Sequence, residues 1–279
     1  MISMHNRLKA LFGAQFNPFT SDIPVDKCYI SCEVQAFIIR VEEISSSGGY
    51  AMLTGMSGIG KSTTLRTIAY KLEESSKLIP AIISRPQSGL RDFYRELGTI
   101  FGVDLNTANR FGSFKDMRGK WQKLIKDTCF RPVLIIDEAQ SAREEVLSEL
   151  RLLGSIELDS QCLTAVILAG DERLSEKLQS PELLPLASRM REKLILRPYP
   201  QNELEKMLAH VLEQANCSQM LSSGVRMLLT EHSCGNPRTM MNRAEQLLSA
   251  ALREEISVID EKTYHRVFSI TSPSKKGIR

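Results

Sequence analysis

The sequence predicts an α/β fold in which helices flank a five-stranded parallel sheet, with a smaller all-helical domain after it. Five short apolar runs rich in β-branched residues have the length of buried strands. Segments with helical periodicity separate these runs, and strands that alternate with helices form parallel sheets. Beyond the Pro198-Tyr-Pro200 segment only helical patterns follow. This change of pattern marks the expected boundary between the two domains.

Each element follows from one of these patterns. The expected strands are 50–54, 80–84, 132–137, 163–169 and 193–197. The expected helices of the α/β domain are 61–75, 90–101, 118–127, 142–156 and 172–179, and those of the helical domain are 202–216, 223–232, 237–254 and 260–270. We expect an N-terminal extension (1–25), the α/β domain (26–198), a helical lid domain (199–270) and a flexible tail (271–279).

Composition limits the function. The 279 residues include 36 Lys+Arg and 33 Asp+Glu, a net charge of +3, and 42% are hydrophobic. These values exclude a disordered, collagen-like or coiled-coil chain. A near-neutral protein that binds DNA needs a local basic patch or many copies side by side. No apolar run approaches the ~20 residues of a membrane span, and no signal peptide is evident. We therefore expect a cytoplasmic protein without membrane contact and with reduced cysteines.

The strongest motif is the segment from Gly55 to Ser62, which fits G-x-x-x-x-G-K-[ST] between an expected strand and an expected helix. Glycines let the backbone turn so that its N–H groups point at phosphate oxygens, and the helix N-terminus favours an anion. Lys61 would contact the β- and γ-phosphates, and Ser62 would bind Mg²⁺. The predicted nucleotide-binding residues are Gly55, Met56, Ser57, Gly58, Ile59, Gly60, Lys61, Ser62 and Thr63.

A second motif is the apolar strand that ends in Asp137 and Glu138. Acids at the end of a buried strand are costly unless they hold a metal or a partner. Asp137 would join the Mg²⁺ shell, and Glu138 would polarise the water that attacks the γ-phosphate. An Asp-Glu pair after a strand is also often a simple helix cap. The phosphate loop upstream favours the catalytic interpretation.

Three further segments carry polar side chains with two possible roles. Asp171, after the fourth strand, either orients the attacking water as a sensor 1 residue or caps the next helix. Arg238, in the Gly-Asn-Pro-Arg helix start, would contact nucleotide across a cleft or lie there incidentally. A basic segment would bind the DNA backbone or form a solvated helix face, with Trp121 and two Phe as stacking platforms or core anchors. Its basic residues are Arg110, Lys115, Arg118, Lys120 and Lys123.

Together these segments resemble those of AAA+ ATPases, and more narrowly the ExeA-like group with its transposition helpers of the TniB, TnsC and Mu B kind. The resemblance covers roughly residues 10–270. Its motifs are the Phe12-Gly to Pro18-Phe19 opening, the phosphate loop with its preceding strand, Ile135 to Gln140, Glu149 to Glu157, 163–170, and Gly235-Asn-Pro-Arg238. The chain departs from the group at Asp171, where the group usually has Gln.

The resemblance implies a protein that binds ATP with Mg²⁺, assembles as rings or filaments on double-stranded DNA, and hydrolyses ATP. Arg189 would act in trans as an arginine finger, and Arg238 would act as sensor 2. Without the resemblance, Arg189 would be interpreted as part of a solvated helix face. The expected role is target selection and activation of a transposase, with a separate targeting protein as a further partner. Alternatives are an ExeA-like secretion-pathway assembly ATPase and a slow nucleotide switch.

Overall fold

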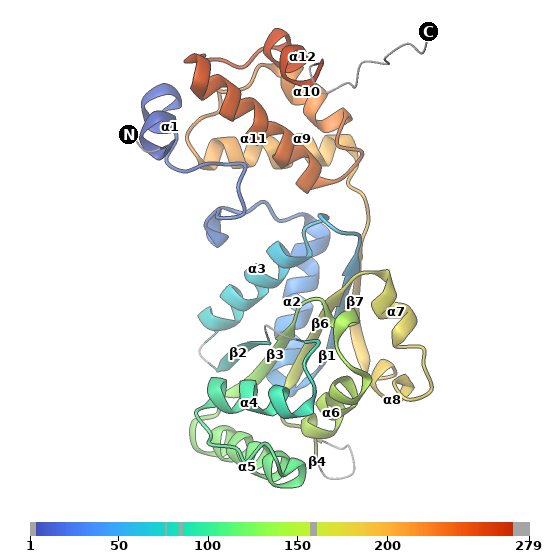
Figure 1. Cartoon of the computed structure of the whole chain (residues 1–279). Helices are drawn as coiled ribbons and strands as arrows, with labels where there is room; N and C mark the ends of the chain where they lie inside the picture. Colours follow the sequence, from blue (N-terminus) through green and yellow to red (C-terminus); the bar gives the residue numbers. More distant parts are fainter. Residues whose placement is uncertain (1–3, 76, 84–85, 157–160, 270–279) are drawn as a thin grey trace. The chain divides into compact units, whose positions relative to one another are not determined.

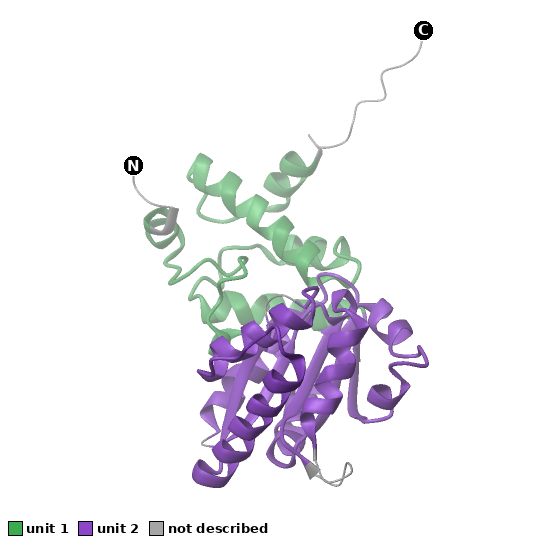
Figure 2. Ribbon diagram, turned by 60° about the horizontal axis from the view of Figure 1, so that its bottom comes forward, with its two compact units in different colours: residues 1–29, 198–279 green, residues 30–197 purple. Residues whose placement is uncertain are grey.

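The computed structural model describes residues 4–75, 77–83, 86–156 and 161–269. The chain forms two compact units: residues 30–197, and residues 1–29 together with 198–279 (Figure 2, purple and green). The residues predicted as an N-terminal extension thus belong to the same unit as the C-terminal helices. The predicted tail 271–279, the predicted ends of a strand at Ser84 and of a helix at Ile270, and Glu157 lie outside the described residues.

The unit of residues 30–197 is built on a parallel sheet with the order β2-β3-β6-β1-β7 (Figure 1). The α/β prediction and its five strands are confirmed. The strands are β1 (Gly49–Gly55), β2 (Leu78–Ile83), β3 (Arg131–Ile136), β6 (Ala165–Gly170) and β7 (Met190–Leu196). The central strand β6 pairs with β3 on one side and with β1 on the other. The carboxyl ends of β1, β6 and β3 therefore lie side by side.

Helices contact both faces of the sheet (Figure 1). One face is covered by α2 (Cys32–Ser47) and α3 (Lys61–Glu74). The core of the other face includes side chains of α4 (Leu90–Phe101), α5 (Arg110–Thr128), α6 (Glu144–Gly154), α7 (Glu172–Lys177) and α8 (Leu184–Ala187). A short 3₁₀ helix, η2 (Ala139–Ser141), follows β3.

Several elements of this unit differ from the prediction. Helix α2 was not predicted, although Val34, Phe37, Ile38 and Val41 recur at helical spacing and are buried. The two-residue strands β4 (Ser155–Ile156) and β5 (Gln161–Cys162) form an antiparallel pair that was also missed. Helix α5 begins at Arg110 instead of residue 118, because the Asn109 side chain accepts a hydrogen bond from the backbone N–H of Gly112 at 3.0 Å.

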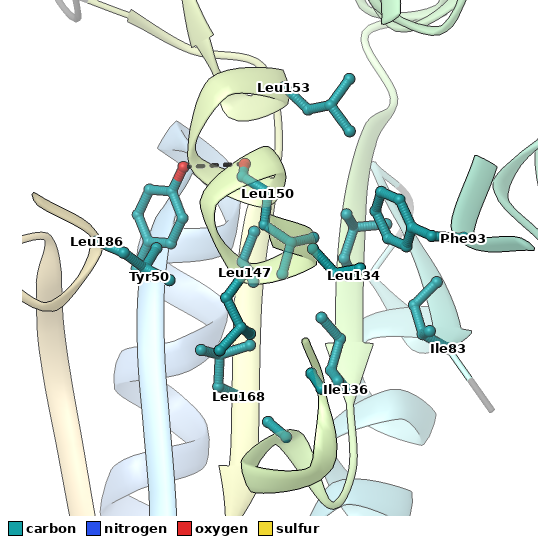
Figure 3. Close-up of a cluster of buried hydrophobic side chains, with 14 of the residues drawn as sticks. Tyr50, Ile83, Phe93, Leu134, Ile136, Leu147, Leu150, Leu153, Leu168 and Leu186 are labelled. Atoms are coloured by element: carbon teal, nitrogen blue, oxygen red, sulfur yellow. Dashed lines mark hydrogen bonds between the residues drawn. The ribbon is translucent and has the colours of Figure 1, made fainter. Parts of the chain in front are cut away.

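The core beneath α4, α5 and α6 is a dense aliphatic and aromatic cluster (Figure 3). Leu134, Ile136 and Leu168 of the sheet face Leu147 and Leu150 of α6. On α5, Ser113, Met117 and Trp121 are buried at intervals of four, so one side of this helix packs on the core. Trp121 is fully buried and lies edge-on against Phe101 of α4. Trp121 is therefore a core anchor.

The named elements of the other unit are all helices in its described part, which also has an isolated β-bridge between Leu221 and Ile259. It contains α9 (Gln201–Gln214), α10 (Ser223–Glu231), α11 (Pro237–Glu254) and α12 (Glu261–Ser269), and from the N-terminus α1 (Met4–Phe12) and η1 (Val25–Lys27). The N-terminal segment belongs to its core, where Leu8, Phe19 and Ile23 are buried. The Tyr29 hydroxyl donates a 2.6 Å hydrogen bond to Glu203 of α9 and lowers the pKa of that carboxyl.

Candidate nucleotide site

The predicted site residues of the two strand-end motifs meet at the carboxyl edge of the sheet. The loops after β1, β3 and β6 are neighbours there because these three strands are adjacent and parallel. Ser62 and Asp137, 75 positions apart, lie within one hydrogen bond of each other: the Ser62 Oγ donates to Asp137 Oδ2 at 2.9 Å. The sheet order therefore places the two motifs together.

The phosphate loop turns on glycines that no other residue would replace without strain. Gly58 has φ 81° and Gly60 has φ 109°, in the region that glycine tolerates best. A Cβ on Gly55 would lie 2.8 Å from the carbonyl oxygen of Leu196, so the end of β1 also needs the absence of a side chain. Gly60 is the N-cap of α3, whose first backbone N–H groups point out of the helix end. This end is suited to bind an anion.

Lys61 is held by the loop itself. Only 7% of its surface is exposed, and its Nζ donates to the carbonyl oxygens of Gly55 at 2.9 Å and Met56 at 3.2 Å. Met56 and Ser57 are exposed at the loop tip, whereas Ile59 is fully buried and anchors the loop. The lysine is thus fixed against the phosphate loop, next to the predicted position of the phosphate groups.

The residues present fit a Mg²⁺ ion. Magnesium prefers oxygen ligands and is usually held by one or two protein groups together with phosphate oxygens and water. The Ser62 hydroxyl and the Asp137 carboxylate supply two such oxygens at one point. Within the described residues there is no cluster of three His, Cys, Asp or Glu side chains that would bind a metal unaided. The two oxygens match the protein share of a Mg²⁺ shell that phosphate oxygens and water would complete.

Glu138 lies next to this pair in an unusual backbone conformation. Its φ is 52°, in the left-handed region, and its backbone N–H donates to Asp137 Oδ1 at 2.8 Å. This conformation costs energy for a residue other than glycine, and such strain is frequent at functional sites. The side chain is exposed, and its Oε2 accepts a 2.5 Å hydrogen bond from the Gln140 amide. Sequence reasoning assigned Gln140 no role.

Asp171 caps a helix. Its carboxylate accepts a hydrogen bond from the backbone N–H of Arg173, so it is the N-cap of α7, and it also pairs with the Arg173 guanidinium at 2.6 Å. The bonds from Arg173 lower the pKa of this carboxyl. Of the two roles predicted for Asp171, the structure shows the helix cap. The role of this residue in orienting water stays a prediction.

Two of the arginines predicted to reach other molecules contact Ser155 within the chain. Arg189, directly before β7, donates through Nη1 to the Ser155 hydroxyl. Arg118 of α5 donates through Nη2 to the Ser155 carbonyl at 2.6 Å and lies over the Phe114 ring. Because the strands are parallel, the start of β7 lies at the amino edge, opposite the phosphate loop. Within one chain, Arg189 is therefore at the other end of the sheet from its own phosphate loop.

Arg110 also has an internal partner. Its guanidinium donates to both carboxylate oxygens of Glu149 on α6, whose side chain is 1% exposed. The same carboxylate accepts from the buried Tyr94 hydroxyl. The bond to Glu149 raises the pKa of Arg110, and burial raises the pKa of Tyr94. Arg110 links α5 to α6, so it would have to give up its bond to Glu149 in order to contact DNA.

Four further basic residues of α5 are exposed, namely Lys115, Lys120, Lys123 and Lys126. Lys115, Lys120 and Lys123 have no hydrogen-bond or ion-pair partner in the part of the chain that the structure describes. At 100° per residue they fall within about 140° of the helix circumference, so they share one side. Lys126 lies on this side too, as do Asp116 and Asp127, which reduce its net charge. The basic surface of α5 is thus narrower than the sequence predicted.

In the helical unit, Arg238 lies in the first turn of α11. Asn236 caps this helix, since its side chain accepts from the backbone N–H groups of Arg238 and Thr239. Pro237 occupies the first helical position, as the sequence signal predicted. The Arg238 side chain is exposed.

Comparison with known proteins agrees with this geometry. Residues 44–178, which contain the phosphate loop, Asp137 and Glu138, match the family model described as an AAA domain. These residues are thus similar to AAA domains, and the five-stranded parallel sheet with flanking helices is the fold of AAA+ P-loop NTPases. A relative of the chain is general secretion pathway protein A of Aeromonas hydrophila, 28% identical over 245 residues. The match covers 85% of this chain and 42% of that protein, so the chain spans less than half the length of this relative.

Solved structures share the fold beyond the AAA domain. The ORC2 protein of Aeropyrum pernix has a TM-score of 0.71 at 16% identity, covering 96% of this chain and 74% of that one. The ORC1 protein of the same organism, solved in complex with DNA, also has a TM-score of 0.71, at 13% identity (91% and 68% covered). The RuvB Holliday junction branch migration motor of Thermotoga maritima has a TM-score of 0.57 at 16% identity (86% and 70% covered). At such identities the likeness concerns the fold.

Proposed function

We propose that this chain binds ATP with Mg²⁺ and hydrolyses it, and that the ATP-bound form assembles on double-stranded DNA. The observation that carries the hydrolysis part is the 2.9 Å bond between Ser62 and Asp137 beside the buried Lys61. Hydroxyl, carboxylate and lysine are the groups that P-loop ATPases use around the β- and γ-phosphates. Residues 55–63 would form the nucleotide-binding loop, and Ser62 and Asp137 would hold the Mg²⁺ ion.

Each group of the chain then has a defined task. A bound Mg²⁺ ion would neutralise charge on the phosphate oxygens. Lys61 and the N–H groups of the loop orient the γ-phosphate and stabilise its negative charge. Glu138 accepts the proton of the attacking water, because its carboxylate is exposed and directly follows Asp137, which would hold the Mg²⁺ ion. Arg238 would complete the nucleotide site as sensor 2, and Arg189 would act on the nucleotide of a neighbouring copy.

A pair of conservative substitutions tests the hydrolysis part. Asp137→Asn removes the carboxylate that bonds Ser62, and Asp92→Asn, the matched control, changes an exposed carboxylate that bonds Arg95. We expect Asp137→Asn to lower the rate at saturating ATP at least about a hundredfold and to raise the Mg²⁺ concentration needed for activity. Asp92→Asn should change the rate less than about fivefold. Equal losses in both variants would remove Asp137 from its proposed role.

The DNA part of the proposal is supported by charge and by similarity. Lys115, Lys120 and Lys123 give each copy a small basic surface on α5. Many such surfaces in a row bind the phosphate backbone additively, because each phosphate contact releases counterions. Two proteins that share the fold, ORC1 in complex with DNA and the RuvB branch migration motor, are named for work on DNA. We propose that the assembly marks a DNA target and activates a transposase, with a separate targeting protein as a further partner.

A second candidate function is assembly of a secretion apparatus. The similarity to general secretion pathway protein A favours it. In the described residues no helix has both the length and the apolarity to cross a membrane. A slow nucleotide switch is a third candidate, and it would hydrolyse ATP at a rate that DNA does not change.

Co-sedimentation with duplex DNA separates these functions. The protein is mixed with a slowly hydrolysed ATP analogue or with ADP, and pellets are inspected by negative-stain electron microscopy. The DNA proposal predicts rings or filaments only with both DNA and the ATP analogue. Single particles in every nucleotide state, at low salt, would contradict it and favour the secretion or switch function.

A further inference from the structure

We propose that Gln140 is a positioning residue that fixes the carboxylate of Glu138 by linking it to the end of β6. The inference rests on the proposed function, in which Glu138 activates water. It concerns one side chain, Gln140, and its two amide atoms, which contact two different strand ends. No phosphate contact is assigned to Gln140.

The amide of Gln140 spans the space between these ends. Its Nε2 donates to Glu138 Oε2 at 2.5 Å, and its Oε1 accepts from the backbone N–H of Asp171 at 3.3 Å. The orientation of the amide follows from its partners, since a carboxylate only accepts and a backbone N–H only donates. The carboxylate that polarises water is therefore tied, through three atoms of one amide, to the first residue after β6.

The turn after β6 is shaped for this contact. A Cβ on Gly170 would collide with Gln140 Oε1, so only glycine lets the amide approach. The φ angle of Gly170 is outside the left-handed region, so its backbone conformation alone does not call for glycine. The absence of a side chain at Gly170 serves the Gln140 contact and the packing of Leu174, which is the other neighbour of that position.

The main chain of Gln140 is also fixed. Lys177 of α7 donates through Nζ to the Gln140 carbonyl at 3.1 Å and to the carbonyl of Ala142. The segment η2 is therefore attached to α7 at its backbone and to the β6 end at its side chain. A movement of the β6–α7 turn would be transmitted to Glu138 by Gln140. Since β6 also adjoins β1, this turn lies between the two loops of the nucleotide site.

The alternative is that Gln140 only stabilises the fold. Gln140 is half-buried at the surface, and its side chain contacts the Glu138 carboxylate, which is exposed. A hydrogen bond to an exposed carboxylate contributes little to folding, whereas it decides where that carboxylate points. A positioning role predicts that loss of the amide lowers the rate at constant nucleotide affinity. A role in folding alone predicts a loss of stability.

The first test replaces Gln140 by Met, which has a similar length and no amide. Gln179→Met is the matched control, because Gln179 is exposed nearby and its side chain has no hydrogen bond among the described residues. We expect Gln140→Met to lower kcat about tenfold, with the Kd for ATP and the Tm within error of the parent. Gln179→Met should leave all three unchanged. An unchanged kcat in Gln140→Met, or a loss of rate matched by a loss of affinity or Tm, overturns the proposal.

A double-mutant cycle supplies an independent test. Gly170→Ala should lower kcat about tenfold, because the new methyl group pushes the Gln140 amide away from Glu138. In a Gln140→Ala background, Gly170→Ala should lower kcat less than about twofold. The new methyl group crowds Leu174 in both backgrounds, so this crowding does not account for a difference between them. Additive effects of the two substitutions overturn the link through Gln140.

Glu138→Gln, measured in parallel, separates this inference from the proposed function. If Glu138→Gln abolishes hydrolysis while Gln140→Met keeps the full rate, the function stands and the Gln140 proposal falls. If the parent protein hydrolyses no ATP, or Glu138→Gln turns over normally, the proposed function fails and the role of Gln140 fails with it.

Discussion

The two edges of the same sheet hold their polar side chains in different ways. At the carboxyl edge, Ser62 and Glu138 are exposed. Ser62 bonds Asp137 of the neighbouring loop, and Glu138 bonds Gln140 two residues further on. At the amino edge, Arg189 and Arg118 turn inward to Ser155, and Tyr50 is buried among apolar side chains. Exposed groups that converge are available to a ligand, whereas groups that satisfy one another inside the fold stabilise it. The comparison separates a candidate site from a structural network that contains the same residue types.

The largest effect is expected from Arg189→Ala. If Arg189 leaves Ser155 to act on a neighbouring copy, its loss should lower the hydrolysis rate of the assembled protein about a thousandfold and remove the dependence of the rate on protein concentration. Arg191→Ala is the matched control, since Arg191 is exposed two residues further on. The rate is measured over a range of protein concentrations. An unchanged rate with a lowered Tm would assign Arg189 to the amino-edge network alone.

At the carboxyl edge, Lys61→Ala should lower kcat/KM for ATP about a hundredfold, because an ammonium group directed at the phosphates is lost. Lys71→Ala is the control, as Lys71 lies on the same helix α3 and pairs with the exposed Glu74. The measurement is steady-state hydrolysis with nucleotide binding by calorimetry. Near-normal affinity and rate in Lys61→Ala would contradict the placement of phosphate in this loop.

Next in size is the effect of Glu149→Ala on stability. The substitution leaves the buried Tyr94 hydroxyl without its acceptor and removes the partner of Arg110. We expect a loss of about 3 kcal/mol in the free energy of unfolding, determined by urea titration. Glu145→Ala, which affects only an exposed pair with Arg143 at 3.8 Å, should cost less than about 0.5 kcal/mol. Similar values for both variants would show that burial does not strengthen the Glu149 contacts.

Replacing Lys115, Lys120 and Lys123 by Ala should weaken binding to duplex DNA about tenfold. It should also make the slope of log K against log salt concentration shallower, by the equivalent of up to about three phosphate contacts. The control removes three lysines of the helical unit, Lys9, Lys206 and Lys262, which are also exposed. Binding is followed by fluorescence anisotropy at several salt concentrations. Equal losses in the two triple variants would attribute DNA binding to net charge instead of to α5.

The smallest effect at neutral pH is expected from Tyr50→Phe, which should lower the free energy of unfolding by about 0.5 kcal/mol. Burial raises the pKa of Tyr50 to about 12 from its usual 10. The folded state therefore keeps this proton where the unfolded state loses it, and the stability of the parent protein falls as the pH rises from 10 to 12. The phenylalanine variant lacks this contribution. Its stability relative to the parent should rise over this interval, and a constant difference would contradict the burial of the hydroxyl.

The sequence was sufficient to predict the carboxyl edge because its motifs follow directly from strand ends. Residues 55–62 and 137–138 each come after an apolar run, and parallel strands bring such ends together. The same reasoning predicted the sheet. Ser62 therefore meets Asp137 where it was expected.

The amino edge could not be predicted in this way. Ser155 belongs to a two-residue strand that has no periodicity, and a hydrogen bond to Arg189 or Arg118 depends on how α5 and α6 pack. The buried Glu149 appeared in the sequence as the start of the motif from Glu149 to Glu157, with no predicted partner. Gln140 was visible beside Glu138, but its contact with the end of β6 depends on the path of the backbone through Gly170.

Single-turnover hydrolysis by Glu138→Gln tests the central claim most directly. Protein in excess over ATP is sampled for product in the presence of Mg²⁺, and nucleotide binding is measured on the same preparation, with Glu172→Gln as the control for an exposed acid at the start of α7. The account predicts normal ATP affinity and at least about a hundredfold loss of hydrolysis in Glu138→Gln alone. Hydrolysis at the parent rate in that variant would contradict it.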